Sequence, residues 1–206
     1  RPFKGKPGYF ERKNSQRKDF SIEPPDETLL DILHKAGFYT VGIGKIGDIF
    51  GHRGLAEEIH TANNLHGIEL TCEAMQRHKD EKGLIFTNLV DFDMLYGHRR
   101  DTKGYALALE QFDKKLPQII KNMTSNDILM LTADHGCDPT FTHHTDHTRE
   151  YVPLLVYGEA AKQGVDLGIR DTFADCGQTI ADLLGADKLL NGKSFKDDIV
   201  SGCACS

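Results

Sequence analysis

Apolar residues gather along the chain in short runs, and longer stretches of mixed polarity separate these runs. Four runs rich in aliphatic, aromatic or β-branched residues are predicted to form strands: residues 38–43, 84–90, 128–132 and 152–157. Stretches with helical spacing predict helices within 54–81, at about 102–121 and at 175–184. This alternation indicates an α/β fold with a doubly wound, mainly parallel sheet and helices on both faces.

Residues with special backbone preferences mark the expected helix ends. Asp26 is predicted as the N-cap of a further helix that stops at Gly37. Gly185 is predicted to end the helix at 175–184. Pro117 should kink the helix at 102–121, because proline removes one backbone hydrogen bond. The apolar face of the first helix is expected to contain Leu29, Leu30, Ile32 and Leu33.

The first 25 residues differ in composition from the remainder of the chain. They are rich in Lys, Arg and Pro and end in Pro24-Pro25. Such a stretch, with few periodic apolar positions, is typical of an extended or linker-like segment rather than a folded unit. We therefore expect two parts, a segment at 1–25 and an α/β core at 26–206.

Composition argues against some classes of function. The chain has 206 residues, of which 27% are charged and 39% hydrophobic, as in ordinary soluble globular proteins. Its net charge of −6 argues against a nucleic-acid-binding protein that relies on a basic surface. The apolar runs are too short to span a membrane, and the basic N-terminus lacks the apolar region of a signal peptide. We expect neither a nucleic-acid partner nor a membrane partner.

The cysteines are few and scattered. An odd number without regular spacing argues against a disulfide framework and favours a reducing compartment, hence the cytoplasm. Cys203 and Cys205 form a terminal C-x-C pair, for which a metal or redox role stays open as an alternative to no role. The five positions are Cys72, Cys137, Cys176, Cys203 and Cys205.

Polar side chains cluster next to three of the predicted strands, at residues 91–101, 133–136 and 145–150. In open α/β sheets, ligands bind beyond the carboxyl ends of the strands. Asp and His together suit zinc or manganese, whereas calcium and magnesium prefer oxygen ligands alone. A single cluster of this kind is commonly a helix cap or a loop, but three together favour a metal site. The residues themselves do not distinguish Asp91 from Asp93.

Several motifs resemble the phosphopentomutases of the alkaline phosphatase superfamily. "TADHGCDPT" followed by "TDHTREYVPLLVYG" carries the likeness most specifically, and "FTNLVDFDMLYGHRRD" and "RPFKGKPGYFERK" extend it over most of the chain. The resemblance implies an alkaline phosphatase-like core, here incomplete, with residues 1–25 as a remnant of the end of a cap domain. The chain then corresponds to the C-terminal half of such an enzyme.

The resemblance also implies two manganese ions in the intact enzyme. Asp93, His98 and His147 are similar to the ligands of one ion, and Asp134 and His135 to part of the second set. His143 and His144 have no counterpart as ligands. The loop that holds them is one residue longer than expected, which makes His144 a competitor of His147.

Three basic residues are expected on the substrate side. Arg12 matches an arginine of the family's cap domain, and the resemblance implies that it binds the phosphate of the sugar. The bidentate guanidinium group suits a phosphate. Lys45, in a Gly-rich turn without P-loop spacing, is expected to line the active site. Arg149 is either a phosphate contact or the partner of a nearby carboxylate. For Arg12, a solvated surface arginine is the plain alternative.

The implied activity interconverts ribose or deoxyribose 1-phosphate and 5-phosphate through a phosphothreonine intermediate. The family's threonine nucleophile and one further aspartate ligand are not found in these residues and are expected upstream. We therefore expect no catalytic nucleophile, and no activity, in this chain alone. The expected partners are small pentose phosphates, and the intact enzyme is expected to be a monomer. The alternatives are a cofactor-independent phosphoglycerate mutase or phosphohydrolase of the same superfamily, or an inactive metal-binding fragment.

Overall fold

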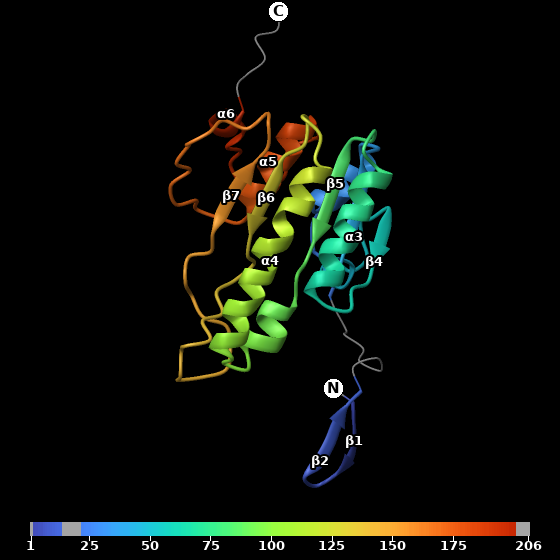
Figure 1. Ribbon diagram of the computed structural model, residues 1–206. Helices are drawn as coiled ribbons and strands as arrows, with labels where there is room; N and C mark the ends of the chain where they lie inside the picture. Colours follow the sequence, from blue (N-terminus) through green and yellow to red (C-terminus); the bar gives the residue numbers. More distant parts are fainter. Residues whose placement is uncertain (1, 14–21, 201–206) are drawn as a thin grey trace, which may run out of the picture.

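The computed structural model describes residues 2–13 and 22–200, apart from the side chain of Arg12. Figure 1 shows an α/β body with a separate hairpin near the N-terminus. The strands are β1 (Phe3–Lys6), β2 (Tyr9–Arg12), β3 (Tyr39–Ile43), β4 (Glu57–Ile59), β5 (Gly83–Thr87), β6 (Leu129–Thr132) and β7 (Leu154–Tyr157). The helices are α1 (Leu29–Lys35), α2 (Ile46–Ile49), α3 (Asn64–Arg77), the π-helix η2 (Phe92–Gly97), α4 (Thr102–Asn122), α5 (Ala174–Leu184) and α6 (Lys196–Ile199).

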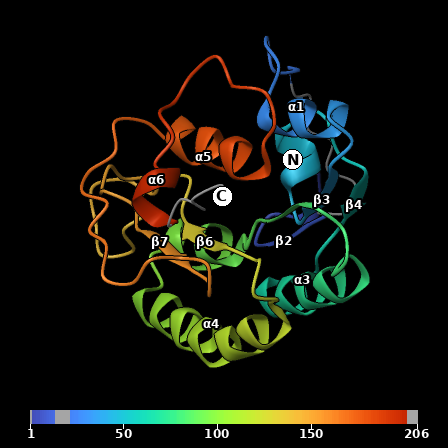
Figure 2. The same cartoon turned by 90° about the horizontal axis from the view of Figure 1, so that it is seen from above.

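The central sheet is parallel and has the order β4-β3-β5. Its middle strand β3 is almost wholly buried, and Val41 and Ile43 form a core cluster with Ala74 of α3. Seen from above in Figure 2, α3 and α4 lie on one side of the strands and α1 and α5 on the other. The expected α/β class with helices on both faces is therefore confirmed.

The strand pair β6 and β7 departs from the parallel arrangement. These strands are antiparallel, with Leu129 opposite Tyr157, and within the described residues they form a sheet of their own. The reason lies in the connection, because residues 133–153 contain no helix and a parallel return needs a long crossover, usually helical. The sheet is thus incomplete between β5 and β6, as expected, and Phe86 of β5 is 37% exposed.

The helix ends follow the expected chemistry with one correction. Thr28, not Asp26, is the N-cap of α1. The Thr28 hydroxyl accepts from the backbone N–H of Asp31, and the Asp31 carboxylate accepts from the N–H of Thr28 at 2.8 Å, which is a capping box. Gly185 ends α5 in the left-handed conformation as predicted. The helix α4 contains Pro117 in its interior and continues beyond it to Asn122.

The sequence pattern did not reveal the hairpin β1–β2, the strand β4 or the short helix α2. Residues 3–12 were expected to be linker-like, yet Pro7-Gly8 joins two paired strands, with Gly8 at φ +84°. The hairpin has no inward face, since Phe3, Tyr9 and Phe10 are all exposed, and so its strands lack an alternating pattern. β4 escaped notice because its sequence, "EEI", is mostly charged. No helix in the described part of the chain is both long and apolar enough to cross a membrane.

Candidate metal centre

The donor-rich side chains meet where β5 and β6 end. The π-helix η2 follows β5, and the loop of residues 133–150 follows β6. In Figure 1 both lie at the same end of the body, which agrees with the rule that sites form at the carboxyl edge of such sheets. The site therefore combines one short helix with one long loop.

The helix η2 places Asp93 and His98 against each other. Its hydrogen bonds join residues five apart, and the N–H of His98 donates to the carbonyl of Asp93 at 3.0 Å. His98 Nε2 lies 3.2 Å from Asp93 Oδ1. His98 Nδ1 lies 2.6 Å from the carbonyl oxygen of Thr145 and must donate to it, because a carbonyl only accepts. This bond orients the ring so that Nε2 faces the carboxylate.

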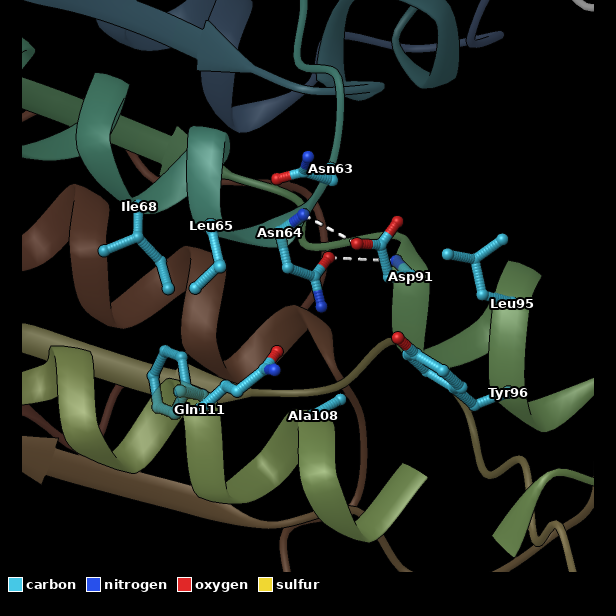
Figure 3. A pocket seen from close by; sticks show the side chains of 10 residues that line it. Asn63, Asn64, Leu65, Ile68, Asp91, Leu95, Tyr96, Ala108 and Gln111 are labelled. Atoms are coloured by element: carbon cyan, nitrogen blue, oxygen red, sulfur yellow. Dashed lines mark hydrogen bonds between the residues drawn. The ribbon is translucent and has the colours of Figure 1, made fainter. Parts of the chain in front are cut away.

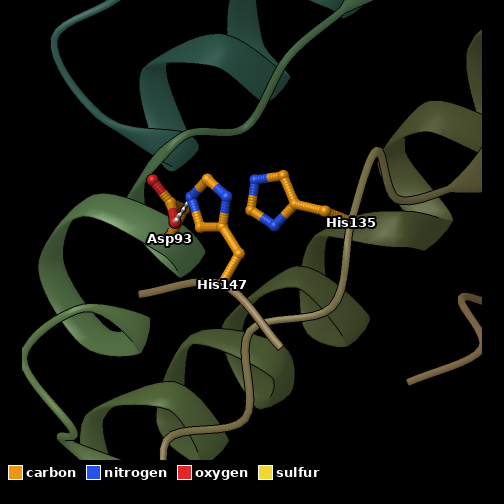
Figure 4. A group of neighbouring side chains, drawn as sticks. All are labelled: Asp93, His135 and His147. Carbon is orange, nitrogen blue, oxygen red and sulfur yellow. Dashed lines mark ion pairs between the residues drawn. The ribbon is translucent and has the colours of Figure 1, made fainter. Parts of the chain in front are cut away.

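The loop of residues 133–150 folds back on itself and brings two more imidazoles to the site. The N–H of Thr148 donates to the carbonyl of Gly136 at 2.9 Å, and its hydroxyl accepts from the N–H of Asp138 at 2.7 Å. The rings of His135 and His147 stack as a result, with centroids 3.6 Å apart. His147 Nε2 lies 3.4 Å from Asp93 Oδ1, and Figure 4 shows the His147 ring between Asp93 and His135.

Four of the predicted metal ligands thus lie together, while the fifth stands apart. Asp93, His135 and His147 each offer a ligand atom within 4.8 Å of the others. His98 joins Asp93 in a second such group. Asp134 takes part in neither group. Its side chain is 70% exposed, and its nearest described partner in the site is His135 Nε2, at 3.7 Å.

Two residues in the cluster were not predicted from the sequence, Cys137 and Asp146. The Cys137 thiol lies 3.7 Å from Asp93 Oδ1, and burial, together with the Asp93 charge, raises the pKa of Cys137 to about 11. A hydrogen bond from the N–H of His147 lowers the pKa of Asp146, which forms a third group of donors with His98 and His147. The available signal was their position, inside "DHGC" and beside His147.

Asp91 and Asp93, which the residues alone left undistinguished, point to different places. Asp91 is buried and accepts from the N–H of Asn64 at 2.7 Å, while its own N–H donates to Asn64 Oδ1 at 2.9 Å. Figure 3 shows this pair on the wall of a pocket of about 230 Å³, between α3 and α4, whose lining includes Tyr96 and Gln111. Asp91 thus holds η2 against α3, and Asp93 faces the histidines.

The basic residues predicted to meet substrate are spread out. Lys45 is half-buried and caps α2 directly beyond β3, at the carboxyl edge of the sheet. Arg149 is exposed in the loop after His147. Arg12 ends β2 opposite Phe3, but its side chain lies outside the described part of the structure. No described contact joins these three residues to the cluster.

The remaining candidate residues stand outside the cluster. His143 and His144 are exposed, and their rings pack beside Phe141 at 5.1 and 4.8 Å between centroids. His144 Nδ1 accepts from the N–H of Asp146 at 3.3 Å, and so it supports the loop without joining the metal groups. Cys203 and Cys205 lie outside the described residues.

The donor set fits a divalent cation. Tetrahedral ligand atoms about 2.0–2.1 Å from an ion lie roughly 3.3 Å from each other, close to the 3.2 and 3.4 Å between Asp93 Oδ1 and the two imidazole nitrogens. Carboxylate oxygen and imidazole nitrogen together suit zinc, manganese or a similar transition metal. Within the described residues no Lys or Arg pairs with Asp93, so a bound cation would neutralise this carboxylate.

Fold and cluster together define a metal-binding α/β domain, and the chain belongs to the metalloenzyme superfamily, whose family model matches residues 31–188. The chain is 52% identical over 197 residues to the phosphopentomutase of Clostridium kluyveri, covering 96% of this chain and 50% of that protein. It is 52% identical over 200 residues to that of Clostridium acetobutylicum, covering 97% and 50%. The phosphopentomutase of Caldanaerobacter subterraneus subsp. tengcongensis is 53% identical over 195 residues, covering 95% and 49%. The chain spans about half the length of these curated relatives.

Proposed function

We propose that this chain is the metal-binding part of a phosphopentomutase, which interconverts ribose or deoxyribose 1-phosphate and 5-phosphate. One observation carries the proposal. In a chain about half identical to phosphopentomutases, a carboxylate and two imidazoles meet at the carboxyl edge of the sheet with the spacing of metal ligands. The expected metal is manganese, two ions in the intact enzyme, as the resemblance to phosphopentomutases implies, and Asp and His donors are compatible with it.

Each of the five predicted ligands has a role in this proposal. Asp93, His98 and His147 hold one ion, and His135 with Asp134 contributes to the second. For Asp134 this requires its exposed side chain to turn inward when the second set is complete. Bound divalent ions neutralise phosphate charge and lower the pKa of a coordinated hydroxyl. The hydrogen bond from His98 Nδ1 to the Thr145 carbonyl orients the ring so that Nε2 is directed at Asp93.

The proposed reaction uses a phosphothreonine that lies outside these 206 residues. Its phosphoryl group passes to the free hydroxyl of the bound pentose monophosphate, which becomes a bisphosphate, and the threonine then takes the other phosphoryl group. Lys45 and Arg149 would contact phosphate oxygens, with Arg12 contributing from the cap side. We place the enzyme in the cytoplasm as a monomer that acts on small pentose phosphates, with no nucleic-acid or membrane partner.

Metal titration of this chain tests the proposed site. Manganese should bind, and His147→Ala should weaken binding by about 100-fold, since a ligand to the ion is lost. His143→Ala is the matched control, because His143 lies in the same loop without joining the cluster, and it should bind as the parent does. Equal binding by both variants would contradict the site.

Activity assays separate the reaction from its alternatives. The full-length polypeptide should form ribose 5-phosphate from ribose 1-phosphate without releasing inorganic phosphate. Phosphate release would favour a phosphohydrolase, and turnover of phosphoglycerate would favour the corresponding mutase. The 206-residue chain alone should bind metal but not turn over. A normal rate from this chain alone would refute the placement of the nucleophile.

A further inference from the structure

A sulfur atom stands among the oxygen and nitrogen donors of the metal centre. Cys137, Asp93 and His98 each offer one ligand atom, and these atoms all lie within 4.8 Å of one another. Cys137 is half-buried and its thiol is free. The site proposed above uses Asp93 and His98 but does not use this sulfur.

The position of the sulfur is fixed by the fold. Gly97, the last residue of η2, is buried directly beside it, and a Cβ at this position would lie 2.4 Å from Cys137 Sγ. The absence of a side chain at Gly97 therefore makes the space that the thiol fills. The backbone on the other side is held by the Gly136–Thr148 bridge, one residue before Cys137.

The distances match a tetrahedral ion with mixed ligands. With metal–oxygen and metal–sulfur bonds of about 2.0 and 2.3 Å, the oxygen and sulfur of a tetrahedral site lie roughly 3.5 Å apart. Cys137 Sγ lies 3.7 Å from Asp93 Oδ1, and His98 Nε2 lies 3.2 Å from the same oxygen. Small side-chain movements would bring both distances to their tetrahedral values.

We propose that Asp93, His98 and Cys137 form a site for a thiophilic divalent cation, and that zinc is the ion it binds. Thiolate ligands select soft or borderline ions, whereas manganese favours oxygen and nitrogen ligands. On binding, the thiol proton passes to solvent and a metal–sulfur bond forms. The carboxylate and the thiolate then supply two negative charges, which match a divalent cation.

This site and the manganese site exclude each other, because both use Asp93 and His98. Zinc would therefore compete with manganese and withdraw two ligands from the catalytic set. The inference rests on the proposed metal centre but not on the pentose phosphate reaction. It makes Cys137 a determinant of metal selectivity.

Cadmium, a thiophilic probe, tests the inference spectroscopically. The parent for this experiment carries Cys203→Ser and Cys205→Ser, so that the terminal pair cannot bind the probe. Cadmium should give an ultraviolet sulfur-to-metal charge-transfer band in the parent and in the matched control Cys176→Ser, which alters a thiol on α5. Cys137→Ser should abolish the band and weaken cadmium binding at least about tenfold, while manganese affinity changes less than about threefold.

Two results would overturn the inference. One is a band that persists in Cys137→Ser, and the other is a parent that binds manganese but shows no band with cadmium. If the parent binds neither ion, the proposed metal centre fails together with this inference, so the two failures are distinguishable. A measurement without a Cys137 variant adds an independent check. Zinc should slow alkylation of Cys137 relative to Cys176, and equal rates with and without zinc would contradict the site.

Discussion

Two clusters of histidine and carboxylate lie at different places on the molecule, and only one of them contains its own cation. The first cluster surrounds Glu57, which accepts from the Tyr39 hydroxyl at 2.8 Å and pairs with Arg77 at 2.9 Å. In the second, His98, His147 and the Cys137 thiol surround Asp93, and no Lys or Arg of the described residues pairs with it.

The difference shows how a structural network can be told from a binding site. Around Glu57 the Arg77 guanidinium balances the carboxylate charge, and His78 Nδ1 lies 2.9 Å from the Glu81 carboxylate while the His78 ring stacks on Tyr39. Around Asp93, ligand atoms of His98, His147 and Cys137 lie close together, and a bound cation would supply the positive charge that this cluster lacks. The first cluster should therefore contribute to stability and the second to metal binding.

The largest expected effect is on manganese affinity, and one mutation in each cluster tests it. Asp93→Asn should lower manganese affinity by about 100-fold or more, because it removes the shared ligand. Glu57→Gln should leave that affinity unchanged. Calorimetric titration of both variants checks this expectation. A comparable loss in Glu57→Gln would show that the two clusters are not independent.

Stability should show the reverse dependence. Glu57→Gln weakens hydrogen bonds from Tyr39 and Arg77 to a charged group and should cost about 1–3 kcal/mol of unfolding free energy. Urea denaturation at neutral pH without metal measures it. Asp93→Asn should not destabilise the metal-free protein, and a loss as large as that of Glu57→Gln would contradict the comparison.

The pH dependence sharpens the same point. Burial alone would raise the pKa of Glu57, but hydrogen bonds from Tyr39 and Arg77 outweigh it, so the pKa is lowered. The Glu57 contribution to stability is therefore present above its unfolded pKa and is lost as the pH falls through the lowered folded value. Urea midpoints followed from neutral pH into acid should fall less in Glu57→Gln than in the parent. Parallel curves would exclude this contribution.

The smallest expected effect concerns the fold of the loop. Thr148→Val keeps the side-chain shape but removes the hydroxyl that accepts from the N–H of Asp138. The loop that carries His135 and His147 should loosen, and manganese affinity should fall about threefold, as for a neutral hydrogen bond worth under ~1 kcal/mol. Thr140→Val is the control, because it removes a hydroxyl that donates to the Asp138 carboxylate in the same loop. An equal fall in the control would show a general effect of the loop.

Much of the fold could be predicted because its signals are local. The runs at 38–43 and 128–132 are apolar enough to indicate buried strands, and Gly185 ends its helix by a backbone preference that no neighbour changes. The hairpin at residues 3–12 could not be found in this way, since it buries no face that would impose an alternating pattern.

The site was predictable only in part, for a similar reason. The resemblance to the phosphopentomutase motifs implied Asp93, His98, His135 and His147, and the structure brings them together. Cys137 faces Asp93 only because Gly97 leaves space and the Gly136–Thr148 bridge turns the loop. These are contacts between distant segments, and no spacing within "DHGC" encodes them. The position of Asp134, outside the groups, depends on the same loop geometry.

The π-helical form of η2 has a consequence for how this protein tolerates change over evolution. Asp93 and His98 face each other because the helix joins residues five apart, whereas an ordinary α-helix would bring residues three or four apart together. Many substitutions within Met94–Tyr96 should be compatible with this geometry. An insertion or deletion of a single residue would turn His98 away from the carboxylate. Natural variation in this segment should therefore be free in composition but fixed in length.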